Sequence, residues 1–377
     1  MRLTKEQLEK VKKDYDVDVL WSWSKISSWH TSKYEWFLHY ITHEEPDRLD
    51  CIYGKEGNYS HDIIEKYYNK EISYEEMIND FQCSWDTARN ILGLKFNRSD
   101  ADKDKVIAER YYNNLKLFFE HHQPLNYKLH TEEFATIKIK NNVLQGYIDA
   151  WYQDENNVIH IIDWKTSSIY TGKTLEEKSG QLVCYAMYFM QKGIPIDKIK
   201  LHFNFLKYAT IIYEQANGKI KSLNVERGQL GDKLQSPCKM WLKKTGYENE
   251  LNDYLKKVLD TDDIKCLPKD VQEKISISDC YVDVPLTMEL VKYWKNYIIN
   301  TINEIEEKIM LYEIYNDESV FYDSIEEVEK ESFYYATLSE YSSNKNICYA
   351  KYLEQLESNI GIDLLNHMLY NKIKNED

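Results

Sequence analysis

Residues 146–165 of this 377-residue chain read GYIDAWYQDENNVIHIIDWK, two β-branched and aromatic segments separated by the polar stretch Asp154–Asn157. Such a stretch between two such segments predicts a β-hairpin. Antiparallel pairing through this turn places Asp149 and Asp163 opposite each other, with Cβ atoms roughly 4.5–5.5 Å apart. Two carboxylates so placed repel each other unless positive charge lies between them.

Lys165 follows Asp163 by two residues and therefore shares its face of the strand. The preceding segment Val158–Ile162 is apolar except for His160, which predicts a buried strand where unpaired charge is costly. Two convergent carboxylates beside a lysine suit a hard divalent cation, with the backbone carbonyl of Trp164 as a further oxygen ligand. Because such a cation polarises a phosphoryl oxygen, the pattern favours metal-assisted phosphodiester hydrolysis.

Other interpretations of these residues stay open. An Asp-x-Lys sequence on a strand is usually a surface ion pair, and Asp149 alone could cap a turn. Asp149 and Asp163 could also serve as the carboxylate pair of an acid–base hydrolase, although that mechanism gives Lys165 no necessary role. Finally, the chain could keep a nuclease fold and bind DNA or a protein partner without cutting.

The rest of the chain predicts an α+β (α/β) fold, a central mixed β-sheet flanked by helices, with helical additions at both ends. We expect a helical region over 1–125, a core over 126–230 and a helical region over 231–377. Expected helices cover 5–15, 22–40 with Ser24 as N-cap, a segment starting at His61 after a glycine-bearing loop at 53–60, then 73–94, 103–122 and 175–191. Expected strands cover 134–139, 143–152 and 158–164 as a meander, then 198–206, 209–214 and 220–225.

Composition restricts the class of protein. The chain has 48 Lys and Arg against 63 Asp and Glu, a formal charge of −15, and 43% hydrophobic residues, which excludes overall disorder. No segment is long and apolar enough for a membrane span, and the N-terminus does not read as a signal peptide. The seven scattered cysteines predict reduced thiols in a cytoplasm, without a disulfide framework. The most basic stretch, from Lys192 to Lys244, is either a groove for single-stranded nucleic acid or a solvated face.

Five short motifs occur in an order that resembles the RecB-like branch of the PD-(D/E)XK nuclease superfamily, over about residues 21–206. They are Ser24-x-Ile26 through Tyr34, Gly57-x-x-x-His61 followed by Glu65, Gly146-x-x-Asp149, Asp163-Trp-Lys165, and Gln181-x-x-x-Tyr185. The resemblance implies a central mixed sheet flanked by helices, with the site on a bent hairpin.

The resemblance also assigns roles to residues. It implies Mg²⁺ or Mn²⁺ as cofactor and Lys165 as the group that orients or helps to deprotonate the attacking water. The implied metal ligands are His61, Asp149, Asp163 and the carbonyl of Trp164; the implied substrate-binding residues are Gln181 and Tyr185, with Glu133 as an acidic residue near the site.

The implied activity is that of a metal-dependent deoxyribonuclease, more readily an exonuclease on DNA ends or single strands than a sequence-specific enzyme. The implied setting is recombination, repair or phage genome processing in a bacterial or phage-infected cytoplasm. A helicase or single-strand-binding protein would be a separate chain, since no Walker motif is present.

Many relatives hold an iron–sulfur cluster, which requires four thiolates. Ser32 stands where the first cysteine would be expected, and Cys266, Cys280 and Cys348 are widely spaced. We therefore expect no iron–sulfur cluster.

Overall fold

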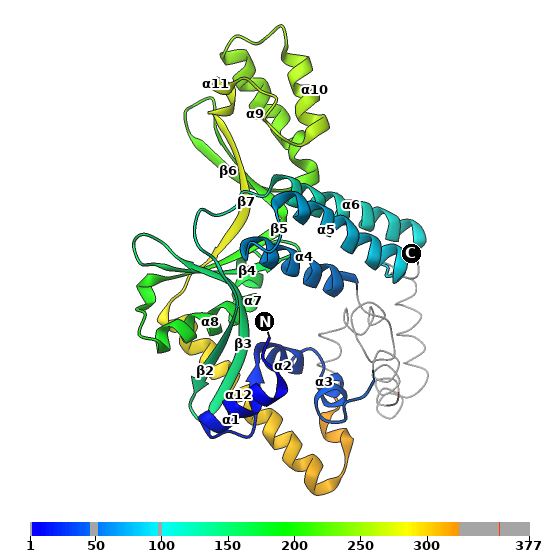
Figure 1. The fold of residues 1–377 in the computed structure, drawn as a ribbon, viewed down its shortest axis with the longest axis vertical. Helices are drawn as coiled ribbons and strands as arrows, with labels where there is room; N and C mark the ends of the chain where they lie inside the picture. The colour runs from blue at the N-terminus through cyan, green and yellow to red at the C-terminus, as the bar shows by residue number, and fades with distance from the viewer. Residues whose placement is uncertain (1, 46–51, 97–99, 324–353, 355–377) are drawn as a thin grey trace. The chain divides into compact units, whose positions relative to one another are not determined.

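The computed structural model describes residues 2–45, 52–96, 100–323 and 354 (Figure 1). The chain forms two compact units, one from Met1–Asp18 with Ile52–Trp294 and one from Val19–Cys51 with Lys295–Asp377. None of the described helices has the length and hydrophobicity that a bilayer crossing requires.

The strands of the first unit form a mixed sheet. Strands β2, β3 and β4 are an antiparallel meander, as predicted; β4 runs parallel to β5, and β5 pairs antiparallel with both β6 and β7. The strands are β2 (His130–Ile139), β3 (Asn142–Gln153), β4 (Ile159–Lys165), β5 (Ile199–Glu214), β6 (Ile220–Glu226) and β7 (Ile275–Val284). The predicted α+β class, a central mixed sheet with flanking helices, is confirmed.

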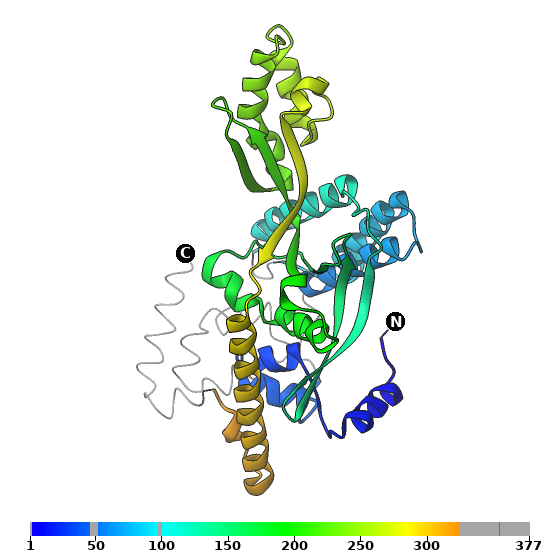
Figure 2. The same cartoon turned by 90° about the vertical axis from the view of Figure 1, so that its left-hand side faces the viewer.

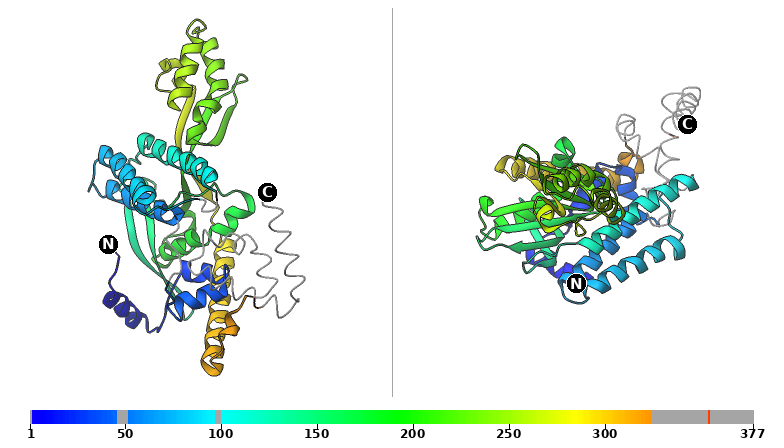
Figure 3. Two further views of the ribbon diagram at one scale, coloured as in Figure 1. Left: turned by 90° about the vertical axis from the view of Figure 1, so that its right-hand side faces the viewer. Right: turned by 90° about the horizontal axis from the view of Figure 1, so that it is seen from above.

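The first unit also contains helices, of which α12 continues into the second unit. They are α1 (Lys5–Tyr15), α4 (Ile52–Tyr68), α5 (Tyr74–Asp86), α6 (Ala101–His121), α7 (Gly172–Lys178), α8 (Gly180–Gln191), α9 (Leu230–Lys244), α10 (Leu251–Thr261), α11 (Lys269–Gln272) and α12 (Met288–Tyr315). Helices α4, α5 and α6 pack side by side (Figures 1 and 3), while α8 contacts β2, β4 and β5.

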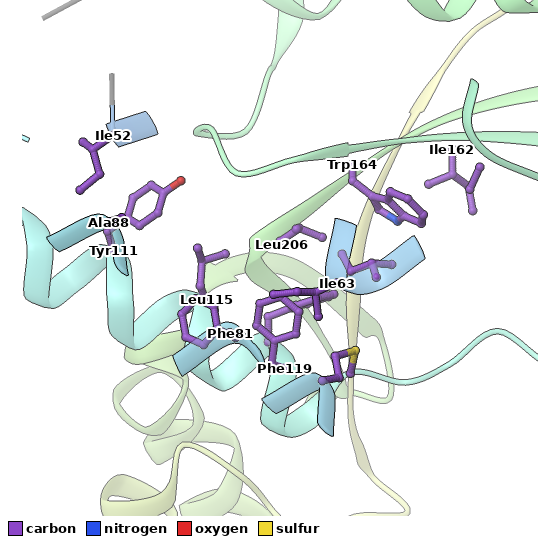
Figure 4. Packing of buried hydrophobic residues seen from close by; sticks show 14 of the residues in the cluster. Ile52, Ile63, Phe81, Ala88, Tyr111, Leu115, Phe119, Ile162, Trp164 and Leu206 are labelled. Atoms are coloured by element: carbon purple, nitrogen blue, oxygen red, sulfur yellow. The ribbon is translucent and has the colours of Figure 1, made fainter. Parts of the chain in front are cut away.

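The main hydrophobic core lies between α4–α6 and the sheet. Ile63, Phe81 and Phe119 from the helices pack with Ile162 and Trp164 from β4 (Figure 4). Because side chains alternate along a strand, burying Ile162 and Trp164 on this face directs the residues between and after them to the opposite face. The core therefore fixes the direction of the two polar residues of β4.

Several predicted boundaries are wrong. Helix α4 begins at Ile52, not at His61, so the two glycines taken as a loop lie inside the helix. The predicted helix 22–40 is two helices, α2 (Trp23–Trp29) and α3 (Lys33–Tyr40), capped by Ser22 and Ser32, so Ser24 is not the N-cap. The predicted strands 198–206 and 209–214 form a single strand, β5. The predicted helix 175–191 is divided at Ser179 into α7 and α8. Strand β7 lies in a region that was expected to be helical.

The second unit is held together by aromatic rings. It contains β1 (Leu20–Ser22), α2, α3 and the later part of α12. Trp29 meets Trp36 edge to face at 5.1 Å, and Phe37 stacks on Phe321 at 4.6 Å. Ser32, which caps α3, donates a hydrogen bond to Asp323, 2.9 Å away, so it has a structural role here. Cys348 lies outside the described residues.

Strands β5, β6 and β7 continue past the main core into an extension that carries α9, α10 and α11 (Figure 2). The extension has a hydrophobic cluster of its own, which includes Leu234, Trp241 and Val258. At its base Arg227 donates to the carbonyl of Leu206 at 2.8 Å and to Asp279 at 2.6 Å. This buried ion pair joins the extension to the main sheet.

Candidate active site

The hairpin β3–β4 opens at its polar end. The last backbone pair of the ladder is Ala150 with Ile162, in the register that the sequence predicted, so Asp149 and Asp163 lie one position beyond it. There the Asp149 carboxylate takes the place of the missing strand partner and accepts a hydrogen bond from the backbone N–H of Trp164, 3.1 Å away. The strands therefore part at the two carboxylates.

Asp163 is fully buried, with 0% of its surface exposed, and forms an ion pair with Lys165. Apart from this lysine, neither carboxylate oxygen has a hydrogen-bond partner among the described residues. Burial alone would lower the pKa of Lys165, but Asp163 and Asp149 raise it above its usual value. Lys165 is therefore a cation beside the buried Asp163 carboxylate.

His61 reaches this site from the middle of α4. Its Nε2 lies 2.8 Å from the carbonyl oxygen of Trp164, so Nε2–H is the donor in that bond. Burial, and then the charge of Lys165, lower the pKa of His61, so the ring is neutral and Nδ1 carries the lone pair. That lone pair faces the Asp149 carboxylate, whose Oδ2 is 3.5 Å from Nδ1.

The surroundings of Asp149 shift its pKa. Burial, followed by repulsion from Asp163, raises its pKa well above the usual value, although Lys165 and the Trp164 N–H act in the opposite direction. Without a cation other than Lys165, the site therefore favours holding a proton on Asp149 over bearing two negative charges.

Glu132 interacts electrostatically with the site. The charge of Glu132 raises the pKa values of both His61 and Asp149. Glu132 interrupts the β2–β3 register with a left-handed backbone, φ 48°, opposite Asp149. Glu133, which the sequence suggested, instead accepts hydrogen bonds from Trp151 at 2.7 Å and Tyr188 at 2.6 Å. Alternation along β2 could not reveal this irregularity, because only the backbone distortion identifies it.

Gln181 and Tyr185 share one face of α8, as expected from their spacing. Gln181 donates to the Tyr185 hydroxyl at 3.0 Å, and that hydroxyl donates to the carbonyl of Tyr147 at 2.5 Å. A Cβ on Gly146 would lie 3.2 Å from the Tyr185 ring, so glycine allows this close approach. The Tyr185 pKa is raised, chiefly by burial and then by the charge of Asp149.

The comparison with protein families gives a clear result. The family model of the PD-(D/E)XK nuclease superfamily matches residues 20–273, more than half of the chain. This chain belongs to the PD-(D/E)XK nuclease superfamily. A search of curated proteins finds no match. Membership of the superfamily indicates a phosphodiester hydrolase acting on DNA, and its members generally use divalent metal ions such as Mg²⁺ or Mn²⁺.

The donors of this superfamily member fit a divalent cation. Both carboxylate oxygens of Asp163 are buried and lack a hydrogen bond with the described residues. His61 Nδ1 lies 3.5 Å from Asp149 Oδ2, and because each atom carries a lone pair, only a proton or a cation between them can bind both. The Trp164 carbonyl keeps a second lone pair beside the one that His61 uses. Among the described residues, no three or more Asp, Glu, His or Cys side chains are grouped so that they could hold a metal ion by themselves. Lys165 holds Asp163 in this arrangement.

Proposed function

We propose that this protein is a metal-dependent deoxyribonuclease of the RecB-like branch, acting as an exonuclease on DNA ends or single strands. The supporting observation is the close approach of His61 Nδ1 and Asp149 Oδ2, 3.5 Å apart, beside the buried carboxylate of Asp163. The order of the sequence motifs supports the RecB-like assignment.

Each residue has a role in this proposal. His61, Asp149, Asp163 and the carbonyl of Trp164 would hold Mg²⁺ or Mn²⁺, which supplies Lewis-acid stabilisation of the charge that develops on the phosphate. Lys165 orients the attacking water and lowers the cost of negative charge through its ammonium group. Gln181 and Tyr185 border the site from α8 and help to position the substrate strand.

The division of the chain stays a prediction: a helical region over 1–125 contributing His61, a nuclease core over 126–230 and a region over 231–377, to which β7 is now added. The proposed setting is bacterial or phage DNA recombination, repair or genome processing in a cytoplasm. A helicase or a single-strand-binding protein would act as a separate partner.

The direct test is incubation of the purified full chain with end-labelled single- and double-stranded DNA, with Mn²⁺, with Mg²⁺ or with EDTA. We expect degradation that requires the cation and proceeds from ends, so that circular DNA survives. Binding of DNA without turnover, unresponsive to divalent ions, would instead show a nuclease fold that does not cut. Hydrolysis that survives exhaustive chelation would favour acid–base catalysis by Asp149 and Asp163.

A further inference from the structure

An open groove of about 1010 Å³ lies at the end of α4, bordered by the turn into α5 and by the segment between α6 and β2. No role described so far uses it. Its aromatic and basic lining residues are Tyr67, Tyr68, Tyr127, Lys70 and Lys128. We call it the tyrosine groove.

The tyrosine groove is linked to the candidate active site through α4 and β2. His61 and Glu65 lie four residues apart on one face of α4, and Asn69, the residue after the end of α4, donates its backbone N–H to the carbonyl of Glu65 at 2.9 Å and lines the groove. The Thr131 hydroxyl donates to the amide oxygen of Asn69 at 3.1 Å, and Thr131 pairs with Ala150, the neighbour of Asp149. Along the helix, His61 and Asn69 are about 12 Å apart, the rise of roughly three to four nucleotides of a stacked strand.

The Tyr127 ring is fixed in an orientation that allows a further ring to stack on it. Its ring stacks on Tyr152 at 4.5 Å and 16°, and Tyr152 stacks in turn on His160 at 4.6 Å and 2°. The Tyr127 hydroxyl donates to Glu155 at 2.9 Å, which fixes the ring. Tyr127 is nevertheless 38% exposed and lines the groove, so one side of a fixed ring remains accessible. Fixed aromatic rings are the sequence-tolerant contact for unpaired bases.

The charges of the groove are balanced. Lys70 and Lys128 are exposed and form no ion pair with the described residues. Glu71 and Glu76 also line the groove, but the Glu76 carboxylate caps α5 by accepting the N–H of Ser73 at 2.7 Å. The groove therefore has no excess of positive charge that would bind any anion. We expect its ligand to offer aromatic rings as well as phosphates.

We infer that the tyrosine groove binds the single-stranded part of a nucleic-acid substrate, with a base on Tyr127 and phosphates near Lys70 and Lys128. The inference rests on the proposed function, because it places this segment about three to four nucleotides from the scissile phosphate. A duplex does not suit the groove, since its bases are stacked on each other and present no free face to Tyr127.

The test measures binding separately from cleavage. Fluorescence anisotropy in EDTA would follow a labelled oligothymidylate of about 12 nucleotides, a length within known single-strand site sizes, on the full chain. We expect Tyr127→Ala to raise the Kd about tenfold, as for loss of one stacked base, while Tyr127→Phe binds like wild type. The double variant Lys70→Ala/Lys128→Ala should make the slope of log K against log salt shallower by about 1.4, two single-strand phosphates.

Lys66→Ala is the matched control, since Lys66 is an exposed lysine of α4 that does not line the groove. Circular dichroism would confirm that each variant is folded. The inference is overturned if the oligothymidylate does not bind, or if the Tyr127→Ala and double-lysine variants bind like Lys66→Ala. Binding that follows the expected pattern in a protein that never hydrolyses DNA would uphold the groove and refute the nuclease proposal.

Discussion

The Asp149 carboxylate accepts the backbone N–H of Trp164 where β3 and β4 part, at 3.1 Å. This bond makes Asp149 both a structural group that satisfies a buried N–H and a charged group of the candidate site. The two roles can be separated by substitution, because an amide keeps the acceptor and loses the charge.

Asp149→Asn should therefore retain stability and lose activity. We expect the rate of cation-dependent DNA hydrolysis to fall by about 10²–10³, with the free energy of unfolding close to that of wild type. Asp149→Ala should be equally inactive and also less stable by about 1–3 kcal/mol, because the Trp164 N–H is left unsatisfied. Urea denaturation beside a nuclease assay distinguishes the two variants. Equal stability of the two variants would contradict the structural role.

Lys165→Met should destabilise the fold, since it leaves the buried Asp163 carboxylate without its cation. The expected loss is about 3–5 kcal/mol in the absence of divalent ions. The double variant Asp163→Asn/Lys165→Met removes both charges and should recover most of that loss, but no activity. A double-mutant cycle in EDTA measures the coupling, and additive effects would show that the two side chains act independently.

Gly146→Ala tests the close approach of Tyr185. The added Cβ would lie 3.2 Å from the ring and push it from the Tyr147 carbonyl, with an expected cost of about 1–3 kcal/mol. Gly54→Ala is the control, because nothing lies within 4 Å of its Cβ position inside α4. That variant should gain up to about 1 kcal/mol from helix propensity. Thermal unfolding checks both, and equal effects would exclude the steric explanation.

Glu56 should make stability depend on pH. Its side chain is fully buried in α4, its oxygens have no hydrogen bond with the described residues, and burial raises its pKa from 4.5 to about 7. A raised acid pKa favours the folded state at low pH, so this contribution is lost as pH rises from about 4.5 to 7. At about 1.4 kcal/mol per pKa unit, Glu56→Gln should gain about 3 kcal/mol over wild type between these limits. Parallel stability curves for the two proteins would refute this assignment.

Divalent ions should stabilise the fold, and more strongly as pH rises. The raised pKa of Asp149 means that the ion-free protein loses stability as pH rises and this group ionises, and a bound cation replaces the proton. With Mg²⁺ or Mn²⁺ at about 100 times its Kd, the gain is about 2.7 kcal/mol. Tm measured with the ion and with EDTA, at several pH values, checks this, and Asp163→Asn should abolish the effect. A gain that is independent of pH would argue against displacement of a proton.

The sequence predicted the hairpin of the candidate site well because its information is local. Alternation of apolar residues and one polar turn were enough to give the Asp149–Asp163 register, which the Ala150–Ile162 pair confirms. The same local pattern gave the meander and the mixed sheet. It identified Asp163 and Lys165 as neighbours on one face, since that follows from spacing alone.

Features that depend on tertiary contacts were missed. Gly54 and Gly57 suggested a loop, but packing of α4 on the sheet outweighs the weak helix propensity of glycine. The sequence pattern predicts helix where strand β7 forms, because the residues of β7 alternate only partly between apolar and polar. Its pairing with β5 joins segments that are far apart in sequence. The electrostatic effect of Glu132 was also missed, because its left-handed backbone is a feature that no side-chain pattern shows.

The Arg227–Asp279 ion pair at the base of the extension limits how the protein can be shortened. Ala209 and Asp279 face each other across β5 and β7, so a short turn between them could close the main sheet without residues 210–278. Arg227 would leave with the excised segment, and Asp279, bound to it at 2.6 Å, would keep His122 at 2.7 Å and the backbone N–H of Gln123 at 3.4 Å. A minimal nuclease would therefore need Asp279 replaced by a neutral residue in the same step. Removal of residues 210–278 alone would leave the buried Asp279 carboxylate without its arginine partner.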